Sequence, residues 1–284
     1  MGENNTIIKI QKFIEELCGI SLNEEKQYLI ESRLARLLVE YDCDDFEQFY
    51  KKINMSKDEK LKEKIIDAIT TNETQWFRDI KPWIFLEKNI LPEAIESVRD
   101  QKIKKFRIWS AASSTGQEAY STSICINEYL IKNNIKDVTL ENFEIIGTDI
   151  SKEVLNIAKE GRYNAISVMR GLDKKYLEKY FEKEGRVFKL NDEIKNIVKF
   201  THFNLLNDFS SLGKFDLIFC RYVLIYFSKE LKKNILEKIS NSLDKNGFLV
   251  VGASEILPDY SNYFKQIEFE KGVYYCHFER GDFI

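Results

Sequence analysis

Histidine is scarce in this chain of 284 residues, in which only His202 and His277 occur. A reaction that needs a histidine base or an all-histidine metal site is therefore disfavoured, and we expect no bound metal. The five cysteines, at positions 18, 43, 125, 220 and 276, include no Cys-x-x-Cys pair. Their odd number and irregular spacing predict free thiols in a reducing cytoplasm, not disulfides or a zinc site.

Long apolar runs and a strong excess of one charge are also missing. No stretch approaches the roughly 18 apolar residues of a membrane span, and the first residues, MGENNTIIKIQKF, do not have the layout of a secretory signal. We therefore expect a cytoplasmic protein that does not insert into a membrane. The 43 basic and 46 acidic residues give a formal net charge of −3, which disfavours a nucleic-acid partner.

The hydrophobic pattern changes along the chain. Residues 5–69 place apolar residues at three- and four-residue steps, which predicts a small helical domain. Pro82 suits the first turn of another helix, running to about Val98. From Lys105 onward, short apolar strands such as FRIWSAA, FEIIGTDI, FDLIFCRYV and GFLVVGA alternate with helices. This alternation predicts an α/β domain with a doubly wound parallel sheet.

One segment does not fit the alternation. Residues 174–195 contain YLEKYF and EKEGRVFKLNDEIK, which predict a short antiparallel hairpin inserted in the sheet domain. We therefore expect a helical domain with its linker over residues 1–81 and a sheet domain over residues 82–284. The inserted β-subdomain is expected over about residues 176–198.

Polar and small residues end three of the predicted strands, where open α/β sheets bind their ligands. The first strand leads into a loop of small residues over 110–116, the second ends at Asp149, and the fourth ends at Arg221. A carboxylate such as Asp149 can accept hydrogen bonds from ribose hydroxyls, so a cofactor containing a nucleoside is indicated. NAD fits poorly, because its pyrophosphate needs G-x-G-x-x-G and this loop has one glycine, followed by Glu118. A structural α/β domain without a ligand remains the alternative.

Five motifs stand in an order and spacing that resemble the CheR-type methyltransferases, which methylate glutamates of chemotaxis receptors. They are TTNETQWFRD, RIWSAASSTGQEAYS, GTDISKEVLNIAKEGRY, FDLIFCRYVLIYF and GFLVVGASE. The resemblance extends over nearly the whole chain and implies a Rossmann-like class I methyltransferase sheet with an all-helical N-terminal domain and an inserted β-hairpin. It also implies S-adenosylmethionine as the cofactor and S-adenosylhomocysteine as its product.

The resemblance further implies the residues of the site. Those that match the family's cofactor contacts are Asn72, Thr74, Arg78, Ala112, Glu118, Asp149, Asn204, Leu205, Arg221 and Tyr222. Arg78 and Tyr226 match positions beside the reacting groups and are the expected catalytic residues. Tyr222 departs from the family, which usually has Asn there, and Ala119 stands where the family often has Pro.

The resemblance implies the receptor's cytoplasmic domain as partner. Lys26, Arg33 and Arg36 lie on one face of the second predicted helix, and the family docks receptors through basic residues of that helix; a solvated helix face is the alternative. Some members also bind a receptor C-terminal peptide through a glycine-rich loop of the hairpin. The matching stretch here, residues 181–188, is short and has one glycine. We therefore expect a monomeric enzyme that does not depend on this tether.

The expected reaction needs no general base. A glutamate side chain has a pKa of about 4.3 in water and is already an anionic nucleophile near pH 7, which agrees with the scarcity of histidine. Alignment and desolvation of the two reactants should supply most of the catalysis. Two alternatives stay open. One is a methyltransferase of this fold that acts on another protein or a small molecule. The other is an inactive cofactor-binding regulatory module, which is suggested by Tyr222 in place of the usual Asn.

Overall fold

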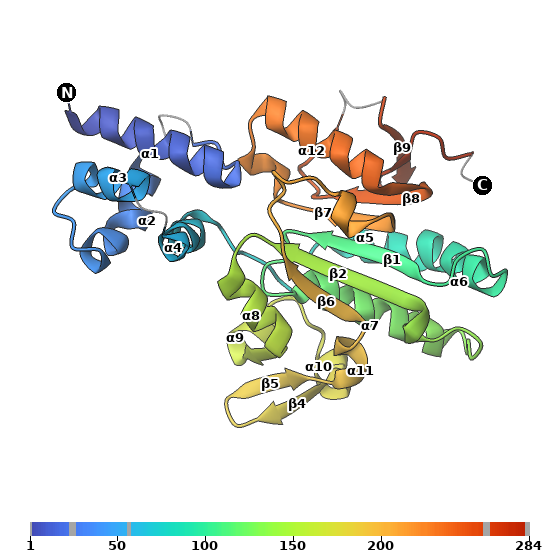
Figure 1. Cartoon of the computed structure of the whole chain (residues 1–284). Helices are drawn as coiled ribbons and strands as arrows, with labels where there is room; N and C mark the ends of the chain where they lie inside the picture. Colours follow the sequence, from blue (N-terminus) through green and yellow to red (C-terminus); the bar gives the residue numbers. More distant parts are fainter. Residues whose placement is uncertain (1, 23–26, 56–57, 258–261, 282–284) are drawn as a thin grey trace.

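The computed structural model describes residues 2–22, 27–55, 58–257 and 262–281 (Figure 1). The chain begins with four helices, α1 Gly2–Cys18, α2 Gln27–Glu40, α3 Phe46–Met55 and α4 Glu59–Ile69. Their apolar faces share one core, in which Ile10, Leu34, Phe49 and Ile65 are buried. The predicted helical region is therefore a packed unit with a core of its own.

The next helical stretch is less regular than the single helix predicted from Pro82 to about Val98. It consists of α5 Ile80–Phe85, the π-helical turn η2 Leu86–Ile90 and α6 Leu91–Arg99. Pro92 has no N–H to donate to the carbonyl four residues earlier, as a regular α-helix requires. In the π-helical turn the N–H of Leu91 bonds instead to the carbonyl of Leu86, five residues earlier.

A seven-stranded sheet forms the centre of the remaining chain, in the order β6-β2-β1-β7-β8-β10-β9. Its parallel strands are β1 Phe106–Ala111, β2 Phe143–Asp149, β6 Val198–His202, β7 Phe215–Cys220 and β8 Leu243–Val251. The antiparallel strands at one edge are β9 Phe264–Phe269 and β10 Gly272–His277. The predicted class of fold is confirmed. Strand β9 was not predicted, because it is an edge strand in which Lys265, Gln266 and Glu268 are exposed and the apolar pattern is weak.

Helices cover both faces of this sheet. The longer ones are α7 Gln117–Lys132, α8 Lys152–Glu160 and α12 Lys229–Ser242, and short 3-10 turns are η3 Leu140–Asn142, η4 Ser210–Leu212 and η5 Leu224–Tyr226. Neighbouring residues of β1 point to opposite sides: Ile108 packs into the core shared with α6 and α7, and Trp109 into the core shared with α12. Strand β1 is therefore buried on both faces.

The inserted subdomain contains the predicted hairpin and one further strand. Strands β3 Arg162–Asn164, β5 Val187–Leu190 and β4 Phe181–Glu184 form an antiparallel sheet in that order, accompanied by helices α9 Ala165–Met169, α10 Lys174–Tyr180 and α11 Asp192–Lys195. With three residues, β3 is too short for an alternating pattern to reveal it.

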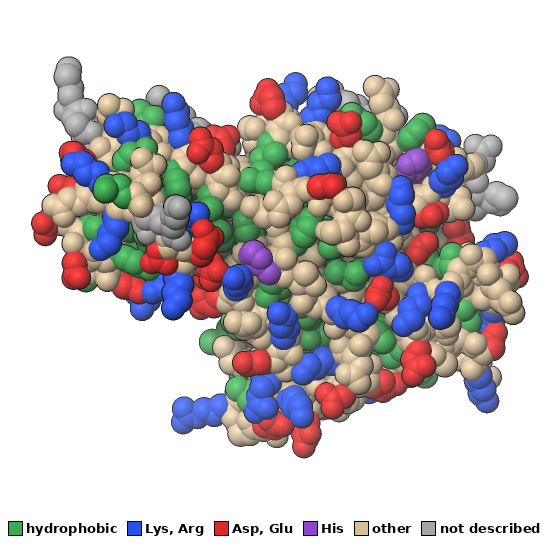
Figure 2. Space-filling view, viewed as in Figure 1, with side chains coloured by type: hydrophobic (Ala, Val, Ile, Leu, Met, Phe, Trp, Pro, Cys, Tyr) green, Lys and Arg blue, Asp and Glu red, His purple; other side chains and the backbone are tan. Residues whose placement is uncertain are grey.

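The chain switches from one side of β1 to the other between β6 and β7, so the carboxyl ends of β1 and β7 flank the switch point. The helical domain lies beyond that end of the sheet (Figure 1). Acidic and basic side chains are mixed over both domains in Figure 2. Within the described ranges, no helix is both long enough and apolar enough to cross a membrane.

Candidate functional site

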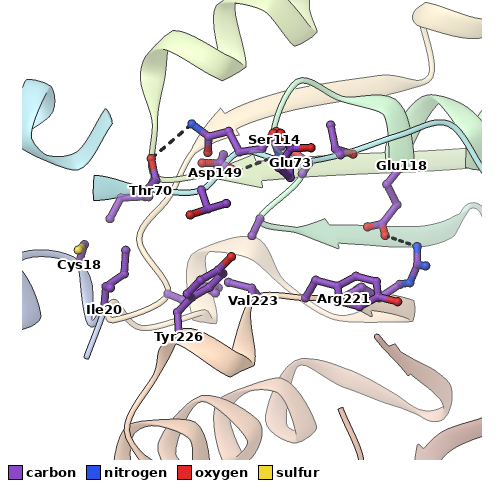
Figure 3. Close-up of a pocket in the computed structure, with 18 of the residues that line it drawn as sticks. Cys18, Ile20, Thr70, Glu73, Ser114, Glu118, Asp149, Arg221, Val223 and Tyr226 are labelled. Atoms are coloured by element: carbon purple, nitrogen blue, oxygen red, sulfur yellow. Dashed lines mark hydrogen bonds and ion pairs between the residues drawn. The ribbon is translucent and has the colours of Figure 1, made fainter. Parts of the chain in front are cut away.

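A cavity of about 970 Å³, including its open mouth, lies between the carboxyl ends of β1, β2 and β7 and the helical domain (Figure 3). Every residue expected to bind the cofactor or to act in catalysis lines it: Asn72, Thr74, Arg78, Ala112, Glu118, Asp149, Asn204, Leu205, Arg221, Tyr222 and Tyr226. These residues come from five segments far apart in the sequence. The motifs thus converge on one place.

Asp149 is held at the end of β2 by the loop that follows β1. Ser114 has a φ of 51°, and its N–H donates to Asp149 Oδ2 at 2.8 Å, while the N–H of Ser151 donates to Oδ1 at 3.0 Å. Burial raises the pKa of Asp149, and these backbone hydrogen bonds oppose that rise. Each carboxylate oxygen keeps a second lone pair, so Asp149 can still accept hydrogen bonds from a diol.

The loop after β1 also needs its glycine. Gly116 has a φ of 92°, and a Cβ there would lie 2.9 Å from the Phe200 ring and 3.0 Å from Ala158. Ala112 adopts a left-handed conformation as well, with a φ of 57°. Left-handed residues that are not glycine cost energy and persist where the surrounding structure holds them, often at ligand sites.

Arg221 links two acidic side chains, and its ion pair with Glu118 lies at one end of the cavity (Figure 3). Its Nη1 donates to Glu118 Oε2 at 2.8 Å, and its Nη2 donates to Asp79 Oδ2 at 2.9 Å and to the carbonyl of Arg78 at 2.6 Å. Glu118 Oε1 also accepts from Ser110 Oγ at 2.7 Å. One buried cation therefore faces two carboxylates, and the negative charge that remains suits a ligand ammonium group.

Arg78 is the contrasting cation. Its Nη1 donates to the carbonyl of Glu73 at 3.2 Å, and its guanidinium carbon lies 3.6 Å from the centroid of the Tyr222 ring. Across the described part of the chain, no carboxylate forms an ion pair with Arg78. Burial, and then the hydrogen bond to Asp79, raise the pKa of the Tyr222 phenol, so this hydroxyl is a donor at neutral pH.

The helical domain supplies one wall of the cavity. Cys18 and Ile20, at the end of α1, line it opposite Glu118 and Arg221 (Figure 3). The side chain of Asn204 donates to the carbonyl of Leu17 at 2.9 Å, and the N–H of Ser21 donates to the carbonyl of Tyr226 at 2.8 Å. No local pattern in the sequence indicates this wall, because it depends on how two separate regions of the chain pack.

The three residues expected to dock a receptor lie apart from the cavity or outside the described ranges. Lys26 falls outside the described residues, and Arg36 is exposed on α2. Arg33 instead turns toward the end of α4, where it donates to the carbonyls of Ile69 and Thr70 and, at 3.0 Å, to Thr71 Oγ1. Arg33 therefore supports the segment that leads into the cavity.

The residues present fit S-adenosylmethionine better than NAD. Asp149 suits a ribose, and the acidic end at Glu118 suits an ammonium group but would repel a pyrophosphate. Ser113 Oγ and Arg221 Nε, from residues that line the cavity, are buried without a hydrogen-bond partner among the described residues, which leaves two polar atoms beside the cavity unsatisfied by the protein. The described ranges contain no cluster of His, Cys, Asp and Glu that would hold a metal, and the five cysteines are free thiols.

Comparison with known proteins agrees with this chemistry. Residues 72–273 match the family described as CheR methyltransferase, SAM binding domain, and residues 5–70 match CheR methyltransferase, all-alpha domain. Chemotaxis protein methyltransferase Cher2 of Pseudomonas putida and chemotaxis protein methyltransferase 1 of Pseudomonas aeruginosa are each 39% identical over 264 residues, which cover 93% of this chain and 94% of theirs.

A chemotaxis protein methyltransferase of Vibrio anguillarum is 38% identical over 266 residues, covering 93% of this chain and 94% of its own. Among solved structures, a TehB-like SAM-dependent methyltransferase of Corynebacterium glutamicum is 13% identical, with a TM-score of 0.35 over 70% of this chain and 95% of that one. That structural likeness is too distant to support a functional argument, but the sequence matches confirm the predicted resemblance. The chain is an S-adenosylmethionine-dependent methyltransferase and belongs to the CheR family.

Proposed function

We propose that the chain methylates glutamate side chains in the cytoplasmic domain of chemotaxis receptors, as part of sensory adaptation. The observation that carries this proposal is the half-buried Arg78, a cation of the cavity without a carboxylate partner among the described residues. An anionic side chain entering the cavity would complete this pair. The name that the relatives carry, chemotaxis protein methyltransferase, supports a receptor as the source of that side chain.

The cofactor would be held by residues on several sides of the cavity. Asp149 would accept hydrogen bonds from the ribose, and Glu118, with Arg221 behind it, would face the ammonium group. Asn72 and Thr74 would meet the amino-acid end, and Ala112 would let that end approach the loop. Leu205 would give an apolar face to the adenine, and Asn204 would hold the wall beside it. Arg221 and Tyr222 would close the end of the cavity beside Glu118, away from the adenine.

When bound, S-adenosylmethionine supplies a methyl group on a sulfonium, and the methyl passes to a glutamate oxygen, leaving S-adenosylhomocysteine and a methyl ester. Arg78 would orient the incoming glutamate or the cofactor carboxylate, and Tyr226 would pack beside the reacting groups. Cys18 and Ile20 form one wall of the cavity, and this wall would keep water from one side of the reactants, which favours a reaction in which opposite charges combine. No proton has to be removed, and burial raises the pKa of the Cys18 thiol to about 11, so Cys18 supplies no thiolate.

The proposal extends to partner, state and place. The exposed Arg36, together with Lys26, would meet the acidic methylation region of the receptor. We propose a monomeric enzyme of the cytoplasm that binds neither nucleic acid nor a receptor C-terminal tether. The balanced charge of the chain supports the first of these exclusions.

The test is transfer of labelled methyl from S-adenosylmethionine to a purified receptor cytoplasmic fragment. We expect label that is released as methanol in mild base, since carboxyl methyl esters hydrolyse there. A fragment with the candidate glutamates replaced by glutamine is the matched control and should stay unlabelled. Label that appears only on other proteins or on small molecules would favour a methyltransferase of this fold with a different substrate. Cofactor binding without any transfer would favour the inactive regulatory module.

A further inference from the structure

The ring of Tyr222 occupies a narrow place at the cavity. On it lies the Arg78 guanidinium, 3.6 Å from the ring centroid, and the Arg221 guanidinium lies 5.7 Å from it. The ring edge lies against the backbone of Gly252, where an added Cβ would come 3.0 Å from two ring carbons. The absent side chain of Gly252 therefore makes room for an aromatic residue at position 222.

The ring is fixed at both ends. The N–H of Tyr222 donates to Glu255 Oε2 at 2.6 Å, and that oxygen also accepts from the N–H of Gly252 at 2.8 Å. The phenol hydroxyl donates to Asp79, which Arg221 holds in turn. Tyr222 has a φ of 59°, a left-handed conformation that is costly for a bulky residue. These contacts hold the strained backbone in place.

Arg78 has far less to fix it. Besides the aromatic ring, the contact of its guanidinium is the hydrogen bond to the carbonyl of Glu73 at 3.2 Å. A guanidinium stacked on a ring keeps its N–H groups in its own plane, free to donate sideways to a carboxylate. An asparagine at position 222, as the family usually has, offers no face for such stacking.

We propose that Tyr222 is a positioning residue that holds the Arg78 guanidinium ready for a carboxylate by stacking beneath it. The inference rests on the proposed function, in which Arg78 meets the reacting carboxylate. Tyr222 acts through Arg78 and touches no reacting atom itself. The hydroxyl fixes the ring, and the face of the ring fixes the arginine.

Three variants separate the ring from the hydroxyl. Tyr222→Phe keeps the ring and loses the bond to Asp79. Tyr222→Leu loses the ring and keeps a side chain of similar backbone demands. Tyr222→Asn also loses the ring, but asparagine adopts the left-handed conformation more readily than other residues. If the leucine variant fails to fold, the asparagine variant still reports on loss of the ring.

The measurements are kcat and KM for the receptor fragment, cofactor affinity by calorimetry, and the melting temperature. We expect Tyr222→Phe to keep kcat/KM within about threefold, and both ringless variants to lose about tenfold, or about 1.4 kcal/mol, because they lose the cation–π contact with Arg78. Cofactor affinity should change by less than the loss in kcat/KM. Ringless variants as active as the wild type would overturn the proposal, as would a phenylalanine variant that loses as much as they do.

Failure of the proposed function is distinguishable from failure of this inference. If the wild-type enzyme transfers no methyl to receptor glutamates, the proposed function is wrong. If the wild type transfers methyl and the three variants all behave alike, only the role of Tyr222 is wrong. The loss of activity across the three variants should follow the loss of the aromatic ring. If it follows the fall in melting temperature instead, that result also counts against a positioning role.

Discussion

Glu118 accepts a hydrogen bond from Arg221 at 2.8 Å, and the side chains of the two residues are only 13% and 2% exposed. Water screens such a pair weakly, so the carboxylate both neutralises Arg221 and sets the charge of this end of the cavity. The pair comes from α7 and from the residue after β7, on either side of the switch point. The pair therefore both holds Arg221 in place and presents a carboxylate to a bound ligand.

Replacing Glu118 with glutamine should weaken cofactor binding about tenfold or more, since a hydrogen bond to a charged group contributes roughly 1.5–3 kcal/mol. The amide retains a hydrogen bond to Arg221 but not the negative charge that faces the ammonium group. Calorimetric titration with S-adenosylhomocysteine measures the change. Glu128, on the same helix but bound to Lys179, offers the matched control Glu128→Gln, which should bind normally. Equal affinity of Glu118→Gln and wild type would contradict the assignment.

Asp149→Asn should lower cofactor affinity tenfold or more. Both carboxylate oxygens of Asp149 accept a backbone N–H, so an asparagine must turn its NH2 group toward one of these donors. The loop after β1 is then expected to shift, in addition to the loss of charge-assisted bonds to the ribose. Calorimetry gives the affinity, and unchanged affinity would remove Asp149 from the site.

The pH dependence of binding gives a second measurement. Burial raises the pKa of Asp149. This carboxyl therefore gains a proton at a higher pH than an ordinary aspartate, whose pKa is about 3.9. Affinity of the wild type should therefore fall as pH is lowered toward that raised pKa, and Asp149→Asn should show a flatter profile. The free energy of unfolding of the free enzyme changes with pH in the opposite direction. The stability that the raised pKa of Asp149 contributes is present at low pH and is lost as pH rises through that pKa.

The sequence predicts those residues of the site that stand at the ends of strands. The ends of β1, β2 and β7 are marked by small residues, Asp149 and Arg221, and parallel strands bring such ends together. The sequence could not indicate that Arg33 bonds to the end of α4, or that Cys18 lines the cavity. Both facts depend on packing between segments distant in the chain, which hydrophobic periodicity does not record.

Arg33 and Arg36 should therefore respond differently to mutation. Arg36→Ala removes an exposed charge and is expected to raise the receptor KM severalfold, an effect that weakens as salt screens the charges, with cofactor affinity unchanged. Arg33→Ala frees the carbonyls at the end of α4, beside Thr70 and Thr71 of the cavity wall. We expect a lower melting temperature and weaker cofactor binding for it. Identical behaviour of the two variants in both measurements would contradict this division.

The inserted hairpin predicts how the enzyme finds its receptor. Glu184 pairs with Val187 across the turn, so only Gly185 and Arg186 connect β4 and β5. Glu184 forms ion pairs with Arg162 and Lys189, so its charge is largely neutralised and would repel an acidic peptide only weakly. Strand β4 remains an edge of its sheet, and an edge can accept an added strand. The turn, however, provides no loop that would close over such a peptide.

We therefore expect the receptor's C-terminal peptide to bind more weakly than micromolar in a calorimetric titration with the purified enzyme. A receptor fragment lacking this peptide should be methylated with a kcat/KM within about twofold of the intact fragment, a difference of less than ~0.5 kcal/mol. The truncated fragment is the matched control, because its methylation region is unchanged. Micromolar binding that disappears when proline replaces Lys183 in β4 would show that the edge strand holds the peptide. That result would overturn tether independence while leaving the methyl-transfer proposal in place.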